Sequence, residues 1–309
     1  MSRMATSTPR LVSALLLILS CSAIESAAPS ASGVTPSQTG APNAPQPVEK
    51  EIAIFGQKIH YLEVGSGPTV ILLHGLGGNG QNWTPNLPAL AAKFHVLALD
   101  QVGFGKSDKP LINYRVATYV DFLNQFCIQL KIERASLVGE SLGGWIAAAF
   151  TIAHPEKVDH LVLSDAAGYA PPANFDNRTL YLLNPSTREN MKLLVGKVFY
   201  NKAFITDAVI DQVLAERIGA GDGYTINSII QSVMRGEDFL DNRAQRIKQP
   251  TLIVWGREDG LVALSDGQRF KKEIPNSTLV VFEQCGHVPN VEKASEFNGA
   301  VMKFLTAIN

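Results

Sequence analysis

The sequence predicts an α/β fold, in which a mostly parallel sheet of eight strands is covered by helices on both faces. Three observations support this prediction. Short β-rich runs alternate with helical stretches from Glu51 onward. The pentapeptide Gly-Glu-Ser-Leu-Gly at 139–143 joins one such run to a helical stretch. Asp259 and His287 then follow two later strand-like runs, in that order.

The eight predicted strands are short runs rich in β-branched and other apolar residues. They cover 51–55, 59–64, 69–73, 95–99, 135–138, 158–163, 251–255 and 278–282. Apolar residues at helical spacing predict helices between and after the strands. These helices cover 116–130, 142–153 and 294–307.

The long interval between the sixth and seventh strands has helical spacing over 188–199, 206–218 and 224–235, with a glycine-rich break at 219–223. A structureless loop of this length is improbable in a compact domain. We therefore expect a helical cap at about residues 169–248, inserted after the sixth strand. There it would cover the carboxyl ends of the strands, where open α/β sheets bind ligands.

The composition suits one large domain with an insert, because the chain has 309 residues, of which 46% are hydrophobic and 18% charged. The net charge of -1 and the lack of a basic run mixed with aromatic residues argue against a nucleic-acid partner. No group of His, Cys and Asp has metal-ligand spacing, and no dinucleotide fingerprint is present. The sequence thus predicts neither a metal nor another cofactor, and it leaves the oligomeric state open.

The N-terminus has the arrangement of an export signal. Arg3 and Arg10 precede an apolar run at 11–19, which is too short to span a bilayer, and small residues follow. We expect residues 1–21 to form a signal peptide. We expect 22–48, rich in Ser, Ala and Pro, to form a flexible linker before a domain at 49–309.

The residues just before Cys21 resemble the lipobox of bacterial lipoproteins, in which this cysteine carries the lipid. Cleavage near Ala23 or Ala28 without lipid attachment is the competing outcome. The predicted location is therefore the bacterial cell envelope, lipid-anchored through Cys21 or periplasmic, or else outside the cell.

Ser141 is the candidate nucleophile. A serine on a tight turn from strand to helix has a strained backbone conformation. Only very small residues fit at the positions two before and two after such a serine, and these positions are occupied here by Gly139 and Gly143. A serine hydroxyl needs a base, for which we assign His287. The imidazole needs a carboxylate partner, for which we assign Asp259, with Asp165 after the sixth strand as the alternative.

The negative charge that develops on the substrate oxygen needs N–H donors. The backbone N–H groups of Leu142, directly after the nucleophile, and Leu76, in the glycine-rich turn after His74, are the candidates for this oxyanion hole, with Gly77 in reserve. We expect His74 to support that turn through a hydrogen bond.

Five motifs carry a family resemblance. They are His-Gly-Leu-Gly-Gly at 74–78, the loop at 100–108, Gly-Glu-Ser-Leu-Gly-Gly at 139–144, Trp-Gly-Arg-Glu-Asp at 255–259 and Gly-His-Val-Pro at 286–289. In this order they resemble the α/β-hydrolase superfamily, and its monoacylglycerol-lipase-like and meta-cleavage-product-hydrolase-like members in particular. The resemblance implies acyl transfer to water through an acyl-enzyme on Ser141.

The resemblance leaves several functions open. Carbon-carbon hydrolases of the meta-cleavage-product type usually have an asparagine before the nucleophile and an aromatic residue after the histidine, whereas this chain has Glu140 and Val288. We therefore expect a carboxylesterase or lipase-like enzyme, acting on a medium-chain acyl ester or a monoacylglycerol. A carbon-carbon hydrolase and a non-catalytic ligand-binding member of the fold are the alternatives.

Overall fold

The computed structural model describes residues 45–172 and 175–307. The predicted signal peptide (1–21), with Cys21 and its lipid, and most of the predicted linker (22–48) lie outside the described residues. Within the described ranges, none of the helices combines the length and the apolar character that crossing a bilayer requires.

The eight predicted strands are all present and form one sheet in the order β1-β2-β4-β3-β5-β6-β7-β8. The pairs β1/β2 and β2/β4 are antiparallel, and the other pairs are parallel. The fold class predicted from the sequence is thus confirmed. The strands are β1 (Val48–Ile54), β2 (Gln57–Val64), β3 (Thr69–Leu73), β4 (His95–Leu99), β5 (Ala135–Glu140), β6 (Val158–Ser164), β7 (Thr251–Gly256) and β8 (Ser277–Phe282).

Strand pairing moves some strand ends away from the predicted positions. β1 begins at Val48, inside the predicted linker, because Val48 pairs with Glu63 of β2. β5 continues to Glu140, because Glu140 pairs with Ser164 of β6. The residue before the candidate nucleophile is therefore held in the sheet.

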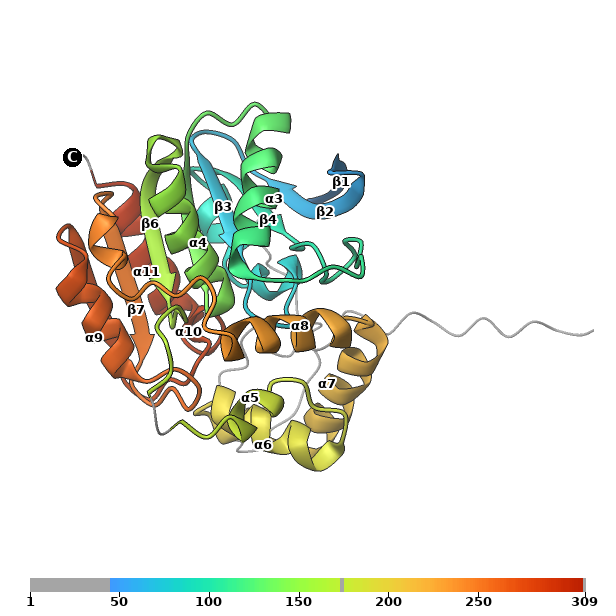
Figure 1. Ribbon diagram of the computed structural model, residues 1–309. Helices are drawn as coiled ribbons and strands as arrows, with labels where there is room; N and C mark the ends of the chain where they lie inside the picture. The colour runs from blue at the N-terminus through green and yellow to red at the C-terminus, as the bar shows by residue number, and fades with distance from the viewer. Residues whose placement is uncertain (1–44, 173–174, 308–309) are drawn as a thin grey trace, which may run out of the picture. The chain divides into compact units, whose positions relative to one another are not determined.

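Helices cover both faces of the sheet (Figure 1). Side chains alternate along β3, so Ile71 and Leu73 belong to the core cluster that includes residues of α3, α4 and α9, whereas Val70 and Leu72 belong to the cluster that includes residues of α2 and α11. The two faces thus carry separate hydrophobic layers. The helices concerned are α2 (Leu87–Ala91), α3 (Val116–Gln129), α4 (Leu142–Ala153), α9 (Leu264–Glu273) and α11 (Ala294–Leu305).

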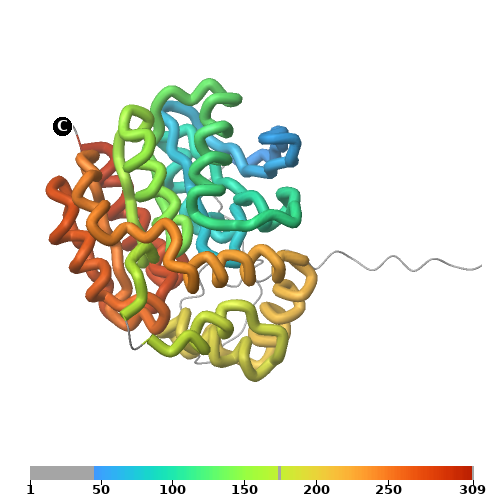
Figure 2. Tube along the Cα trace, in the orientation of Figure 1, coloured from blue at the N-terminus to red at the C-terminus, as the bar shows by residue number. Residues whose placement is uncertain are grey.

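A helical insert separates β6 from β7. It comprises α5 (Arg178–Tyr181), α6 (Arg188–Val198), η3 (Lys202–Phe204), α7 (Asp207–Ala220) and α8 (Gly223–Met234). Its helices gather at the end of the sheet to which the parallel strands point, as the ribbon and the Cα trace both show (Figures 1 and 2). Met191, Val195 and Ile210 form a small core of its own, while Ile226 and Ile230 of α8 belong to the main core.

Candidate active site

Ser141 lies on a sharp turn between β5 and α4. Its backbone has φ 53° and ψ -117°, a strained conformation for a residue with a side chain. A Cβ atom on Gly139 would collide with the carbonyl oxygen of Gly143, and one on Gly143 would collide with that of Leu73. This crowding is the physical reason for glycine at both positions.

Backbone hydrogen bonds to the end of β6 and to the loop after it hold the turn in place. The Ser141 N–H donates to the carbonyl oxygen of Ser164 at 2.9 Å, and the Ala167 N–H donates to that of Ser141 at 3.1 Å. The strained conformation is thus fixed by its surroundings.

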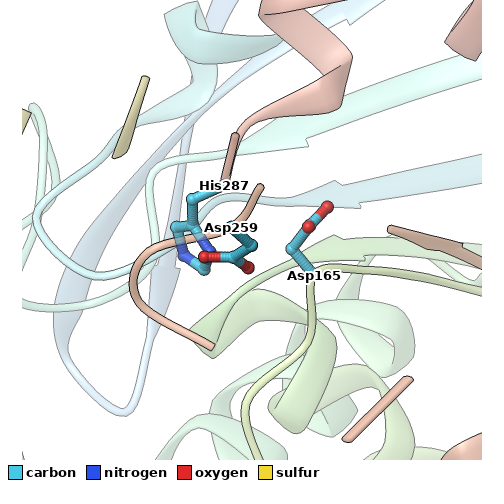
Figure 3. Close-up of side chains that lie close together, drawn as sticks. All are labelled: Asp165, Asp259 and His287. Atoms are coloured by element: carbon cyan, nitrogen blue, oxygen red, sulfur yellow. The ribbon is translucent and has the colours of Figure 1, made fainter. Parts of the chain in front are cut away.

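His287 and Asp259 form a hydrogen-bonded pair. Nδ1 of His287 lies 2.7 Å from Oδ2 of Asp259, whose side chain is fully buried (Figure 3). Oδ1 of Asp259 also accepts hydrogen bonds from the backbone N–H groups of Leu261 at 2.8 Å and Val262 at 3.0 Å. Burial alone would lower the pKa of His287, but the charge and hydrogen bond of Asp259, with the charge of Glu140, raise it overall. The imidazole is thus oriented with Nδ1 toward Asp259, which leaves Nε2 as the candidate base.

Nε2 of His287 faces a second carboxyl group, Oε1 of Glu140, at 3.5 Å. Among the described residues, Ser141 Oγ makes no hydrogen bond, so the bond from serine to histidine is not formed in this structure. Such bonds are often long before substrate binds. Because Glu140 precedes Ser141, the imidazole nevertheless lies at the turn that carries the candidate nucleophile.

Glu140 is a buried acid that sequence reasoning noticed only as a departure from a family pattern. Burial raises its pKa to about 7, although the charge of His287 and a hydrogen bond from the Gly75 backbone oppose the rise. The Glu140 carboxyl group therefore changes charge near neutral pH, next to the nitrogen of His287 that is the candidate base.

Asp165, the alternative triad acid, is fully buried beside the pair and not hydrogen-bonded to the imidazole (Figure 3). Its Oδ1 accepts a hydrogen bond from the Gly256 N–H at 2.9 Å. The structure therefore gives Asp259, and not Asp165, the position of the histidine partner.

His74 supports the glycine-rich turn, as expected. Its Nε2 accepts a hydrogen bond from the Gln101 N–H at 3.1 Å, so Nδ1 carries the proton and donates to the carbonyl oxygen of Gly75 at 2.7 Å. The Gly78 N–H donates to the same oxygen at 3.1 Å. No backbone acceptor is recorded in the described ranges for the N–H groups of Leu76 and Leu142, so both remain available as oxyanion donors.

Arg217 of the insert is a largely buried cation at this turn, and no sequence motif marks it. Its side chain is 11% exposed, and Nη1 occupies the space that a Cβ atom on Gly77 would need. Nη2 contacts the buried carboxylate of Asp222. Burial lowers the pKa of Arg217, but a guanidinium group keeps its charge in proteins. One nitrogen is thus paired, while another faces the glycine-rich turn that carries Leu76, a candidate oxyanion donor.

Asp165, Asp259 and His287 each offer a possible ligand atom to a cation, all within 4.8 Å of one another. Existing hydrogen bonds to Gly256 and between Asp259 and His287 account for this cluster without an ion. The expectation that the enzyme uses no metal stays a prediction.

Comparison with known proteins decides the family. The model of the alpha/beta hydrolase fold family matches residues 68–201 and 222–294, more than half of the chain. The chain belongs to the α/β-hydrolase family. It is therefore assigned as a hydrolase.

Similar proteins include both enzyme classes considered above. The 2-hydroxy-6-oxononadienedioate/2-hydroxy-6-oxononatrienedioate hydrolase of Cupriavidus pinatubonensis is 33% identical over 267 residues, covering 80% of this chain and 90% of that protein. A solved meta-cleavage product hydrolase from Pseudomonas fluorescens has a TM-score of 0.74 at 33% identity, covering 83% of this chain and 97% of its own. A bacterial membrane phospholipase A has a TM-score of 0.73 at 30% identity, covering 84% of this chain and 86% of its own. These relatives favour the carbon-carbon alternative over the expected ester hydrolase.

Proposed function

We propose that this chain is a serine hydrolase of the meta-cleavage-product type. Its substrate would be a 2-hydroxy-6-oxo-dienoic acid, and water would be added across the carbon-carbon bond next to the ketone. The relatives named for this reaction support the proposal, and the observation that carries it is Arg217. A largely buried cation at the glycine-rich turn of Leu76 and Gly77 suits a substrate with a carboxylate.

The proposed reaction uses the site as follows. As Ser141 Oγ attacks the ketone carbon, Nε2 of His287 takes its proton and the N–H groups of Leu76 and Leu142 bind the oxyanion. The proton of the substrate's 2-hydroxyl group would first move to the carbon beside the reacting ketone. When the carbon-carbon bond breaks, its electron pair is therefore delocalised over a dienolate, which then takes the proton from the imidazolium. Water, deprotonated by His287, then hydrolyses the acyl-enzyme and releases a carboxylic acid.

Ester hydrolysis is the second candidate, and Glu140 favours it. A carboxylate beside the nucleophile repels an anionic dienoate but not an uncharged ester. The resemblance to a membrane phospholipase A points the same way. In this reaction the same residues would act, and an alcohol would leave in place of the carbon group.

A comparison of substrates tests the proposal. We expect kcat/KM for a 2-hydroxy-6-oxo-dienoate to exceed that for p-nitrophenyl esters of short and medium acyl chains. The reverse order would make the chain an esterase. Ser141 should react with a fluorophosphonate probe, and Ser141→Ala should abolish both labelling and turnover. Folded wild-type protein that neither labels nor turns over either substrate would point to a non-catalytic binding protein.

A further inference from the structure

Asp165 is a buried carboxyl group to which the proposed reaction gives no role. It follows β6, is 0% exposed, and has the unusual φ of 44° for a residue with a side chain. An oxygen of its carboxyl group lies within 4.8 Å of a carboxylate oxygen of Asp259 and of a ring nitrogen of His287 (Figure 3). A carboxyl group so buried beside another one raises the question of whether it is protonated or ionised.

The charges around His287 do not balance if every acid is ionised. Asp165 and Asp259 are buried side by side, and Glu140 lies on the Nε2 side of the same imidazole. Among the described residues, no lysine or arginine forms an ion pair with any of these three acids. When His287 is neutral, as a base must be, two adjacent buried carboxylates are strongly disfavoured. One of the two aspartates must keep a proton.

Hydrogen bonding decides which aspartate is ionised. Asp259 accepts three close hydrogen bonds, from the N–H groups of Leu261 and Val262 and from Nδ1 of His287. Asp165 accepts one close bond, from the Gly256 N–H, and a longer one of 3.3 Å from the Ser164 hydroxyl. Donors favour the charged form, so Asp259 carries the charge. Burial, followed by the charge of Asp259, raises the pKa of Asp165 well above its ordinary value.

We propose that Asp165 retains its proton and donates it in a hydrogen bond to Asp259, which makes Asp165 a positioning residue for the catalytic pair. The inference rests on the proposed roles of Ser141, Asp259 and His287. The bond fixes the orientation of the Asp259 carboxylate toward Nδ1 of His287. Because Ser164 holds the Ser141 turn, one short segment supports both halves of the catalytic machinery.

Infrared spectroscopy tests the proton on Asp165 without any need for turnover. A protonated carboxyl group has a C=O band that shifts in D₂O and that a carboxylate lacks. The measurement uses the Glu140→Gln background at pH 8, where Glu140 cannot contribute. We expect the difference spectrum between this protein and its Asp165→Asn derivative to contain one such band. A difference that contains only carboxylate bands would overturn the proposal.

Kinetics of three single variants supply the second readout. An asparagine at 165 can accept the Gly256 N–H and donate to Asp259, so Asp165→Asn should keep kcat within about threefold and leave the pH profile unchanged. Asp165→Leu removes the donor and should lower kcat by roughly 10- to 100-fold. Asp259→Asn should lower it by about 10⁴-fold, because the imidazole would take the wrong tautomer.

Two kinetic outcomes would contradict the inference. If Asp165→Asn is as inactive as Asp259→Asn, Asp165 is the ionised acid of the triad. If Asp165→Leu is fully active, the hydrogen bond does not position the pair. Should the leucine variant not fold, the asparagine variant and the infrared band still decide. If no substrate is turned over, the infrared band alone decides the protonation of Asp165, separately from the proposed function.

Discussion

Oε1 of Glu140 lies 3.5 Å from Nε2 of His287, the nitrogen proposed to take the proton from Ser141. A carboxylate here stabilises the imidazolium, which cannot act as a base. Glu140 therefore influences the protonation of His287, the residue proposed to activate Ser141. Two predictions concern this relationship.

Replacing Glu140 by glutamine should move the acid limb of kcat/KM to lower pH. The charge of Glu140 contributes to the raised pKa of His287, so its removal lets the imidazole stay neutral in more acidic solution. The pH dependence of kcat/KM measures the shift. Glu283→Gln changes an exposed carboxylate outside the site in the same way and should leave the limb in place. An unchanged limb in Glu140→Gln, or a rise, would show that Glu140 does not act on His287.

The same substitution should alter stability in a pH-dependent way. The folded pKa of Glu140, about 7, lies above its ordinary value of 4.5. The favourable contribution of Glu140 is therefore fully present below pH 4.5 and is lost as the pH rises through 7. As the pH rises between these limits, the free energy of unfolding of Glu140→Gln should increase by up to about 3 kcal/mol relative to that of the wild type. Urea unfolding of both proteins at pH 4.5, 6, 7 and 8.5 measures this change. If the difference in unfolding free energy between the two proteins is the same at every pH, the prediction is refuted.

Gly143→Ala should prevent folding or destabilise the protein by more than about 3 kcal/mol. Its new methyl group would collide with the carbonyl oxygen of Leu73 in β3, and backbone cannot yield as a flexible side chain does. Gly299, in the middle of α11, has open space around it. Gly299→Ala should instead stabilise the protein by about 0.5–1 kcal/mol. Thermal unfolding compares the two, and equal effects would mean that the turn is not crowded.

Two inactive variants of Ser141 should differ in stability. Both lose the nucleophile, but only glycine adopts φ 53° and ψ -117° without strain. After allowing for the greater freedom of glycine in the unfolded chain, we expect Ser141→Gly to be more stable than Ser141→Ala by about 1 kcal/mol. Chemical denaturation measures the difference. A more stable alanine variant would show that little strain is stored at this turn.

Arg217→Gln should raise KM for a dienoate carboxylate by about tenfold or more, with a much smaller effect on an uncharged ester. The reason is the nitrogen that Arg217 directs at the glycine-rich turn after β3. Arg188 lies on the same insert but is exposed and paired with Asp207 and Asp211, so Arg188→Gln is the matched control. Equal losses on both substrates would indicate that Arg217 only stabilises the insert through Asp222.

The strands and the order of the site residues could be predicted because they depend on local patterns. Strand periodicity, the glycines around Ser141 and the turns before Asp259 and His287 are visible in short windows of sequence. Helix α9 was missed, since Ser265, Asp266 and Gly267 have the composition of a turn. Gly267 is used there because Trp255 packs against it.

The contacts of Glu140, Asp165 and Arg217 could not be predicted, because they depend on packing between distant segments. Glu140 meets His287 only when the sheet has formed and has brought the end of β5 close to the loop after β8. Asp165 was considered as the acid, but its burial beside Asp259 depends on the pairing of β6 with β7. Arg217 reaches Gly77 only when α7 lies over the turn after β3.

The end of α6 has a consequence for protein engineering. The carbonyl oxygen of Val198 accepts the backbone N–H of His287 at 2.7 Å, and that of Lys197 accepts the N–H of Gly260 at 3.2 Å. The loops that carry His287 and Asp259, the proposed base and its acid, are thus anchored to the C-terminal end of α6 in the insert. Chimeras that transplant a foreign insert to change selectivity must reproduce these two carbonyl groups, or they will lose turnover together with the old specificity.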